Sequence, residues 1–237
     1  MDNQADPMGW SSWPARLSKQ SRKRNLRRMN SVDTLASRCL ADLQLDTAEL
    51  DGEYGYAHLP LCIIDAVWSI GVRYSGVQNV IARYRSHFRL HAEFACSPHT
   101  IDIMLREMDN EGALWFAREV FQNMQRTSTR GGILKAEAIH KFAGVLQRHG
   151  MNTLEDVPKI LWYEDLDREI AKPYAQELLG IPGQRSGISL SYFYMLTGSS
   201  GLVKPDRMVK GYLKDVLGKV VSDPEAQYLI SLGVCII

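Results

Sequence analysis

The stretch that decides the fold is AQELLGIPGQRSGISLSYFYMLTGSSGLVKPDRMVKGYL, residues 175–213. Its first half predicts a helix that ends at Leu179, a tight turn around Gly180, Pro182 and Gly183, and a second helix that begins at residue 186 or 187. Glycine in such a turn lets a ligand approach the backbone closely. The first N–H groups of a helix point outward with a partial positive charge, so the turn suits a phosphate group.

The second half of this stretch predicts a third helix with an acidic residue at its start. A Gly/Ser loop, residues 198–201, leads to Lys204, Pro205 and Asp206. Proline is well suited to open a helix, and the helix dipole favours the ionised carboxylate of Asp206. Asp206 has two interpretations at this point, because aspartate is also a common helix cap.

The rest of the chain from Ser31 onward shows helical spacing of apolar residues, so we predict an all-α fold. One segment, residues 59–72, is apolar on almost every face, as expected for a helix buried in the middle of a bundle. The other predicted helices cover residues 33–43, 74–88, 101–108, 113–124, 133–150, 165–179, 187–197, 206–217 and 224–232.

The composition excludes a disordered, a collagen-like and a disulfide-scaffold protein. The chain has 237 residues, of which 45% are apolar and 23% charged, and these values fit a globular protein with a sizeable core. Its four cysteines form no C-x-x-C pair, and its six histidines show no metal-ligand spacing, so we predict no metal site. The sequence contains neither a 20-residue apolar span nor a signal-peptide pattern. We therefore expect an intracellular protein, cytoplasmic or nuclear, without a membrane anchor.

Charge is unevenly distributed along the chain. The formal net charge is only +1, yet residues 1–30 hold seven basic and two acidic residues. We interpret this segment as a flexible basic arm and residues 31–237 as the folded helical unit. Residues 180–220 also carry six basic against two acidic residues, which is compatible with a polyanion bound at one face.

Three segments, taken in order, carry a resemblance to a known family. IPGQRSG, an apolar helix and then VKPDRMV resemble the helix-hairpin-helix and Gly/Pro-Asp motif of the endonuclease III superfamily of DNA glycosylases. GILKAEAIHKFAGVL resembles the helix that precedes the hairpin, and LCIIDAVWSIGVRYSGVQNVIARY resembles an early buried helix and the turn that enters the duplex. The resemblance covers about residues 55–217 and implies a two-lobed helical fold with a cleft between the lobes.

This resemblance implies hydrolysis of the N-glycosidic bond of a damaged base in double-stranded DNA, as in base excision repair. The target nucleotide must leave the stack first, because the bond is out of reach inside the duplex. Asp206 is then the catalytic carboxylate, which stabilises the oxocarbenium-like sugar and orients or deprotonates water. The implied DNA contacts are Gly183, Gln184, Arg185, Ser186 and Gly187 in the hairpin, and Arg73 and Tyr74, which would fill the gap left by the flipped base. Lys204, Arg207 and Lys210 are candidate phosphate contacts, with a solvated helix surface as the alternative.

The sequence departs from the family pattern at three points. Members that also cut the strand have a lysine where this chain has Gly187, so we expect a monofunctional enzyme without Schiff-base chemistry. The four clustered cysteines of the iron–sulfur branch are absent, so no such cofactor is expected. Arg185 replaces the second hairpin glycine, which adds a cation for phosphate but leaves open whether a monovalent metal ion binds there.

Four residues are candidates for the base pocket. Asp65 lies within the apolar segment 59–72, where it would either read a base edge or form a structural pair. Trp68, Tyr192 and Tyr194 are candidates for stacking on the flipped base, with core packing as the alternative for all three. We expect Lys135 to be structural, and the polar loop Arg126–Arg130 to be either a further DNA contact or merely solvated.

Two other classes of function compete with the glycosylase hypothesis. The first is a DNA-binding module that keeps the hairpin and lacks catalysis. The second is a helical scaffold in which the apolar run YLISLGVCII, residues 228–237, binds a protein partner. For the enzyme hypothesis we expect a monomer.

Overall fold

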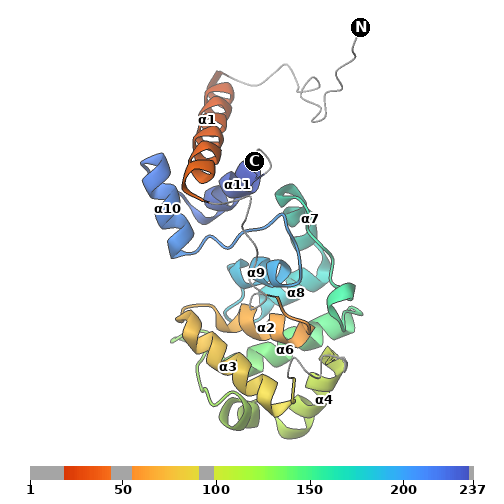
Figure 1. Ribbon diagram of the computed structural model, residues 1–237. Helices are drawn as coiled ribbons and strands as arrows, with labels where there is room; N and C mark the ends of the chain where they lie inside the picture. The colour runs from red at the N-terminus through yellow and green to blue at the C-terminus, as the bar shows by residue number, and fades with distance from the viewer. Residues whose placement is uncertain (1–18, 44–54, 91–98, 235–237) are drawn as a thin grey trace. The chain divides into compact units, whose positions relative to one another are not determined.

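The chain folds as an all-helical protein, which confirms the predicted fold class. The structure, a computed structural model, describes residues 19–43, 55–90 and 99–234 (Figure 1). In these ranges the chain forms eleven α-helices and no strand, with one isolated antiparallel bridge between Arg126 and Leu134. Its contacts divide it into two compact units, Met1–Asp46 with Lys210–Ile237, and Thr47–Val209.

The smaller unit consists of three helices. These are α1 (Lys19–Asp42), most of α10 (Arg207–Leu217) and α11 (Asp223–Val234). α1 packs along α11. The buried hydrophobic side chains of this unit come from all three helices and the link between the last two: Val32, Leu35, Ala36, Leu213, Val221, Ala226 and Leu229.

The larger unit contains the main hydrophobic core. Its helices are α2 (Leu59–Trp68), α3 (Tyr74–His87), α4 (Ile101–Glu111), α5 (Ala113–Trp115), α6 (Lys135–Arg148), α7 (Leu166–Ile170), α8 (Pro173–Gly180) and α9 (Ile188–Leu196). A π-helical turn at Phe116–Val120 continues α5, and short 3-10 turns lie at Leu154–Asp156 and Tyr163–Asp165.

Helix α2 is the centre of the larger unit. All ten of its residues are buried, and it packs against α3, α4, α6 and α9 (Figure 1). The carbonyl end of the helix is closed by Lys135 from α6, whose Nζ donates to the carbonyls of Trp68 at 2.8 Å and Ile70 at 2.9 Å. Burial lowers the pKa of Lys135 to about 8. Lys135 is therefore a structural residue, as predicted.

Several helix boundaries differ from the sequence prediction. The predicted helix 59–72 ends at Trp68, and the predicted helix 113–124 is α-helical to Trp115 and π-helical to Val120. α1 begins at Lys19, so the predicted arm is helical over residues 19–30, while residues 1–18 lie outside the described residues. Lysine and arginine have high helix propensity, which lets a helix continue beyond its packed part without an apolar period. The predicted helix 165–179 is broken into α7 and α8, because Pro173 lacks the N–H that a continuous helix needs.

A buried histidine in this core makes stability depend on pH. His99 is 6% exposed, and its Nε2 lies 2.7 Å from the Tyr84 hydroxyl. Burial lowers the pKa of His99 from 6.5 to about 4. Between these pH values the unfolded chain binds a proton that the folded chain does not, so acidification favours unfolding.

We therefore expect the free energy of unfolding to fall as the pH drops from 6.5 to 4. Urea denaturation of the protein and of a His99→Gln variant at several pH values measures this effect. The difference in free energy of unfolding between the protein and the His99→Gln variant should shrink as the pH falls from 6.5 to 4. A difference independent of pH would contradict a neutral, buried His99.

Candidate functional site

The two predicted helices and the tight turn between them are present as α8, α9 and the segment that joins them. α8 ends at Gly180 and α9 begins at Ile188, each within two residues of the predicted position. Three turn hydrogen bonds connect the helices, from the N–H groups of residues 181, 184 and 187 to the carbonyls of residues 178, 181 and 184. Gly183 (φ +93°) and Gly187 (φ +75°) have left-handed backbone conformations that other residues rarely adopt.

The hairpin presents some of its predicted contact residues and buries another. Arg185 and Ser186 are exposed, and their backbone N–H groups donate to no acceptor among the described residues. Gln184 is only 1% exposed, and its Oε1 accepts a hydrogen bond from the Ser189 hydroxyl. The structure therefore removes Gln184 from the predicted DNA contacts, because its side chain fastens the turn to the start of α9.

Asp206 stands exposed at the start of α10. Its Oδ1 accepts hydrogen bonds from the backbone N–H groups of Met208 at 2.8 Å and Val209 at 2.9 Å. Its Oδ2 has no hydrogen-bond donor among the described residues. One oxygen is thus held by the helix terminus, whose dipole favours the negative charge, and the other is left for solvent or a ligand.

Asp65 is fully buried and receives three hydrogen bonds. Its Oδ1 accepts from the Ser69 hydroxyl at 2.5 Å, and its Oδ2 accepts from the Tyr56 hydroxyl at 2.8 Å and the Tyr192 hydroxyl at 3.3 Å. Desolvation and the neighbouring carboxylate raise the pKa values of Tyr56 and Tyr192, so both phenols stay protonated as donors. These donors satisfy a group whose burial would otherwise be costly.

Tyr192 connects this network to the segment before Asp206. The Nζ of Lys204 lies 3.6 Å from the centroid of the Tyr192 ring, a cation–π contact. Burial lowers the pKa of Lys204, while the charges of Asp65 and Asp206 oppose that shift. The structure therefore brings three predicted site residues, Asp65, Tyr192 and Lys204, into one connected group, and Asp206 follows Lys204 by two residues in the chain.

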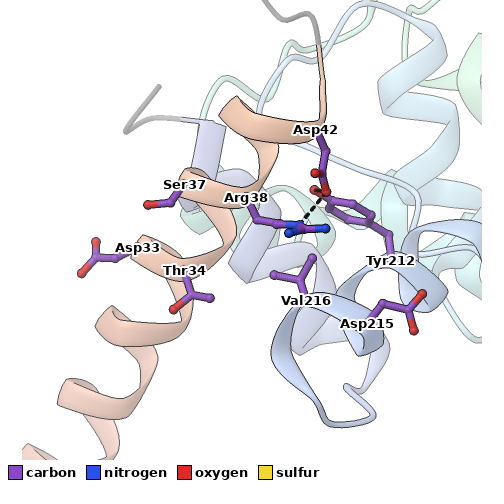
Figure 2. A pocket seen from close by; sticks show the side chains of 8 residues that line it. All are labelled: Asp33, Thr34, Ser37, Arg38, Asp42, Tyr212, Asp215 and Val216. Atoms are coloured by element: carbon purple, nitrogen blue, oxygen red, sulfur yellow. Dashed lines mark hydrogen bonds and ion pairs between the residues drawn. The ribbon is translucent and has the colours of Figure 1, made fainter.

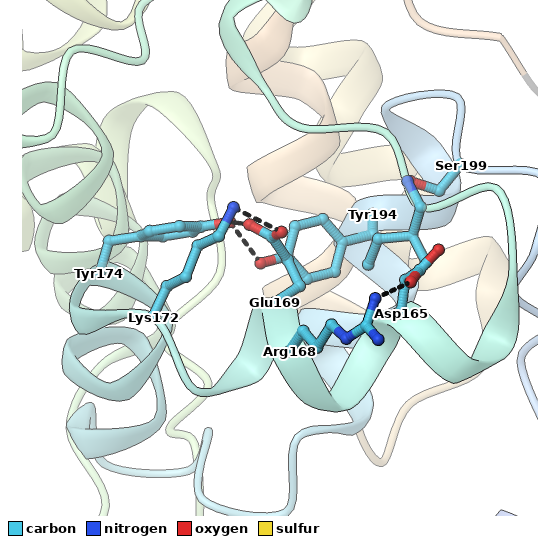
Figure 3. Close-up of polar contacts among 8 residues, drawn as sticks. Asp165, Arg168, Glu169, Lys172, Tyr174, Tyr194 and Ser199 are labelled. Atoms are coloured by element: carbon cyan, nitrogen blue, oxygen red, sulfur yellow. Dashed lines mark hydrogen bonds and ion pairs between the residues drawn. The ribbon is translucent and has the colours of Figure 1, made fainter.

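Two of the predicted stacking residues lie in the core instead. Trp68 is fully buried, and the centroid of its ring lies 5.0 Å from the centroid of the Phe121 ring. Tyr194 is also fully buried, and its hydroxyl lies 2.7 Å from that of Tyr174, which in turn donates to Glu169 (Figure 3). Neither ring has an exposed face for a base, so the packing alternative describes both residues.

The remaining predicted contacts lie on the surface. Arg73 and Tyr74 are exposed at the start of α3, and Arg207 is exposed in the first turn of α10. Lys210 forms an ion pair with Asp223 at 2.7 Å. Because both partners are partly exposed, this pair is weak and does not prevent Lys210 from binding an anion.

Sequence reasoning missed two residues of this region, Ser69 and Tyr56. Ser69 lies four residues after Asp65 on one helix face, and this spacing is a usable signal. Tyr56 gives no such signal, because it reaches Asp65 from outside the helix. The sequence also does not predict that Thr127, in the polar loop Arg126–Arg130, packs against Gly183, which is far from it in sequence.

No described residues form a metal site or a membrane span. Within residues 19–43, 55–90 and 99–234, no three His, Cys, Asp or Glu side chains are grouped to hold a metal ion. The helices of the same ranges all lack the combination of length and apolar character that a bilayer crossing requires.

The smaller unit has a cavity of its own. It measures about 830 Å³ and lies between α1 and α10 (Figure 2). An ion pair between Arg38 and Asp42 at 2.7 Å forms part of its wall, and the Tyr212 hydroxyl donates to Asp42 at 3.3 Å. None of the predicted site residues lines it. The full lining is Asp33, Thr34, Ser37, Arg38, Asp42, Tyr212, Asp215 and Val216.

Replacing the carboxylate of Asp65 and that of Asp206 by an amide should affect the stability of the protein differently. An Asp65→Asn substitution replaces one acceptor oxygen with an NH2 group that faces hydroxyl donors. We expect it to lower the free energy of unfolding by about 1–3 kcal/mol, the usual cost of an unsatisfied buried polar group. Asp206→Asn should change stability little, because asparagine caps a helix as well as aspartate does. Urea denaturation of both variants tests this contrast, and equal effects would contradict it.

Comparisons with known proteins give a family and no characterised relative. No curated protein and no solved structure matches the chain. A family model matches residues 33–236, which span both compact units and include the hairpin, Asp65 and Asp206. The chain therefore belongs to the DUF8548 family, described as a domain of unknown function.

Proposed function

We propose that this protein is a monofunctional DNA glycosylase that removes a damaged base from double-stranded DNA inside the cell. The observation that carries the proposal is the state of Asp206: exposed, held through Oδ1 by the start of α10, and with Oδ2 free of donors among the described residues. A fixed, ionised carboxylate is what a positively charged sugar transition state requires. The resemblance of IPGQRSG and VKPDRMV to the glycosylase motif supports the same assignment.

The proposed reaction is hydrolysis of one carbon–nitrogen bond. The bond between the sugar C1′ and the base nitrogen breaks, and its electron pair leaves with the base. Asp206 stabilises the cationic sugar through Oδ2 and orients a water molecule, whose oxygen bonds to C1′ while its proton goes to solvent or base. The products are the free base and an abasic site.

The hairpin supplies the DNA contact in this proposal. The unused N–H groups of Arg185 and Ser186 and the guanidinium group of Arg185 are suited to a backbone phosphate. Gly187 occupies the position where strand-cutting relatives have a lysine, so the proposed enzyme leaves the strand intact.

A second candidate is a DNA-binding module without catalysis. The observation that favours it is also at Asp206, because capping two N–H groups of α10 is a sufficient structural reason for an aspartate at this position. This candidate shares the hairpin contact with the first and differs only in chemistry.

An Asp206→Asn variant separates the two candidates. Incubation with duplexes that carry alkylated, oxidised or deaminated bases, followed by alkali, converts abasic sites into strand breaks. For the enzyme we expect breaks on at least one lesion and a loss of about 100-fold or more in Asp206→Asn, the usual contribution of a catalytic acid or base. DNA binding and stability should be retained, because asparagine keeps the cap.

Glu225→Gln is the matched control, since it removes a carboxylate near the start of another helix, where Glu225 pairs with Lys219. It should leave cleavage unchanged. DNA binding without breaks on any lesion would favour the binding module, and no binding even at low salt would overturn both candidates. Borohydride trapping of a covalent complex would contradict the monofunctional assignment.

A further inference from the structure

A second polar loop, residues 126–132, is tightly closed and precedes α6. The Thr127 N–H donates to the Ile133 carbonyl at 2.9 Å, and Arg126 Nη1 donates to the Gly132 carbonyl at 2.6 Å. Within the loop the Ser128 hydroxyl donates to the Arg130 carbonyl at 2.7 Å. A Cβ atom at Gly132 would overlap the backbone of Ser128, so only glycine fits there. These contacts fix the loop before any ligand binds.

This loop packs directly against the hairpin. The side chain of Thr127 fills the space beside Gly183, and a Cβ atom at Gly183 would overlap the Thr127 Cβ. The Thr127 hydroxyl oxygen is buried and has no hydrogen-bond partner among the described residues. The two loops are thus in van der Waals contact although 56 positions separate Thr127 and Gly183 in the sequence.

The joined loops carry positive charge without nearby acidic residues in their own segments. The chain has 27 acidic residues, yet none occurs in residues 120–136 or 178–205. Arg130 and Arg185 are exposed, and neither forms an ion pair among the described residues. By contrast, three other arginines form ion pairs: Arg38 with Asp42, Arg148 with Glu177 and Arg168 with Asp165.

Small polar residues lie next to Arg130 and Arg185 in the sequence. Ser128, Thr129 and Ser186 are exposed, and nothing lies within 4 Å of the place where a Cβ atom at Gly131 would be, so the backbone there is open to close approach. Arginines, hydroxyl groups and accessible backbone N–H groups are the donors that proteins use for phosphodiester oxygens. A protein partner with an acidic surface would not need this exposed backbone.

We propose that residues 126–132 and 183–187 form one composite surface that binds neighbouring phosphates of a DNA strand, with Arg130 and Arg185 as its two charged contacts. This inference rests on the proposed function, since it names a second DNA-binding element of the same site. The contact at Gly183 and Thr127 holds the two elements in a fixed relation, so the surface requires no rearrangement to bind.

The salt dependence of DNA binding tests the composite surface. We expect Arg130→Ala and Arg185→Ala each to weaken binding to an undamaged duplex by about 3- to 10-fold at low salt. Each should also reduce the slope of log affinity against log salt by about 1, because one phosphate contact is lost. The double variant should reduce the slope by about 2. Neither side chain makes a hydrogen bond within the described residues, so the variants should fold normally.

Arg106→Ala is the matched control, because Arg106 is an exposed arginine of α4 without an ion pair among the described residues. It should leave affinity and slope unchanged. Binding that is weakened by Arg185→Ala but not by Arg130→Ala would overturn this inference and leave the proposed function standing. A wild-type protein that does not bind DNA would overturn both the proposed function and the composite surface. An effect of Arg106→Ala equal to that of Arg130→Ala would show that binding depends only on overall positive charge, and it would also overturn the composite surface.

Discussion

A carboxylate inside a helix that is buried on every face constrains the larger unit more than any other group. Water cannot reach Asp65, so hydrogen-bond donors of the protein itself must satisfy its carboxylate oxygens. These come from three places: Tyr56 before α2, Ser69 after it, and Tyr192 on α9. Because one of them is on α9, the hydrogen bond fixes the rotation of α9 about its axis relative to α2. The hairpin that precedes α9 is oriented by the same contact.

The influence of Asp65 extends toward the surface through Tyr192. The Lys204 ammonium group lies over the ring whose hydroxyl donates to the buried carboxylate. The cation loses part of its hydration there, which lowers the pKa of Lys204, and the ring face and the charges of Asp65 and Asp206 offset only part of that loss. The segment between α9 and α10 is thereby held against α9. Asp206 follows Lys204 by two residues in the same unit.

Most of the fold follows from patterns that are local in the sequence. Apolar spacing located α2, α3, α4, α6 and α9, and glycine with proline located the hairpin. Pro173 is a local signal for the break between α7 and α8, because proline lacks the N–H that a continuous helix needs. The start of α1 was not predictable from periodicity, because a helix of charged residues has propensity without an apolar stripe.

The site itself was less predictable than the helices. Tyr192 and Tyr194 are two residues apart and lie on nearly opposite faces of α9, so only one of them can face a given site. Sequence alone does not say which. The contact between Thr127 and Gly183 joins segments far apart in the chain, and no local pattern encodes it. The resemblance implies that Gln184 contacts DNA, but its polar side chain instead fastens the turn to the start of α9.

Capping and catalysis are compatible roles for Asp206, because they use different oxygens. The start of α10 holds Oδ1, while Oδ2 accepts no hydrogen bond within the described residues. In bulk water, however, two unit charges 4 Å apart attract by only about 1 kcal/mol, against about 4 kcal/mol in the partly shielded surroundings of a protein surface. In the proposed enzyme, an exposed carboxylate would gain catalytic strength only when a bound duplex displaces the water around it. Tight binding of DNA by the proposed basic surface would then be a condition for the proposed chemistry and not merely a step before it.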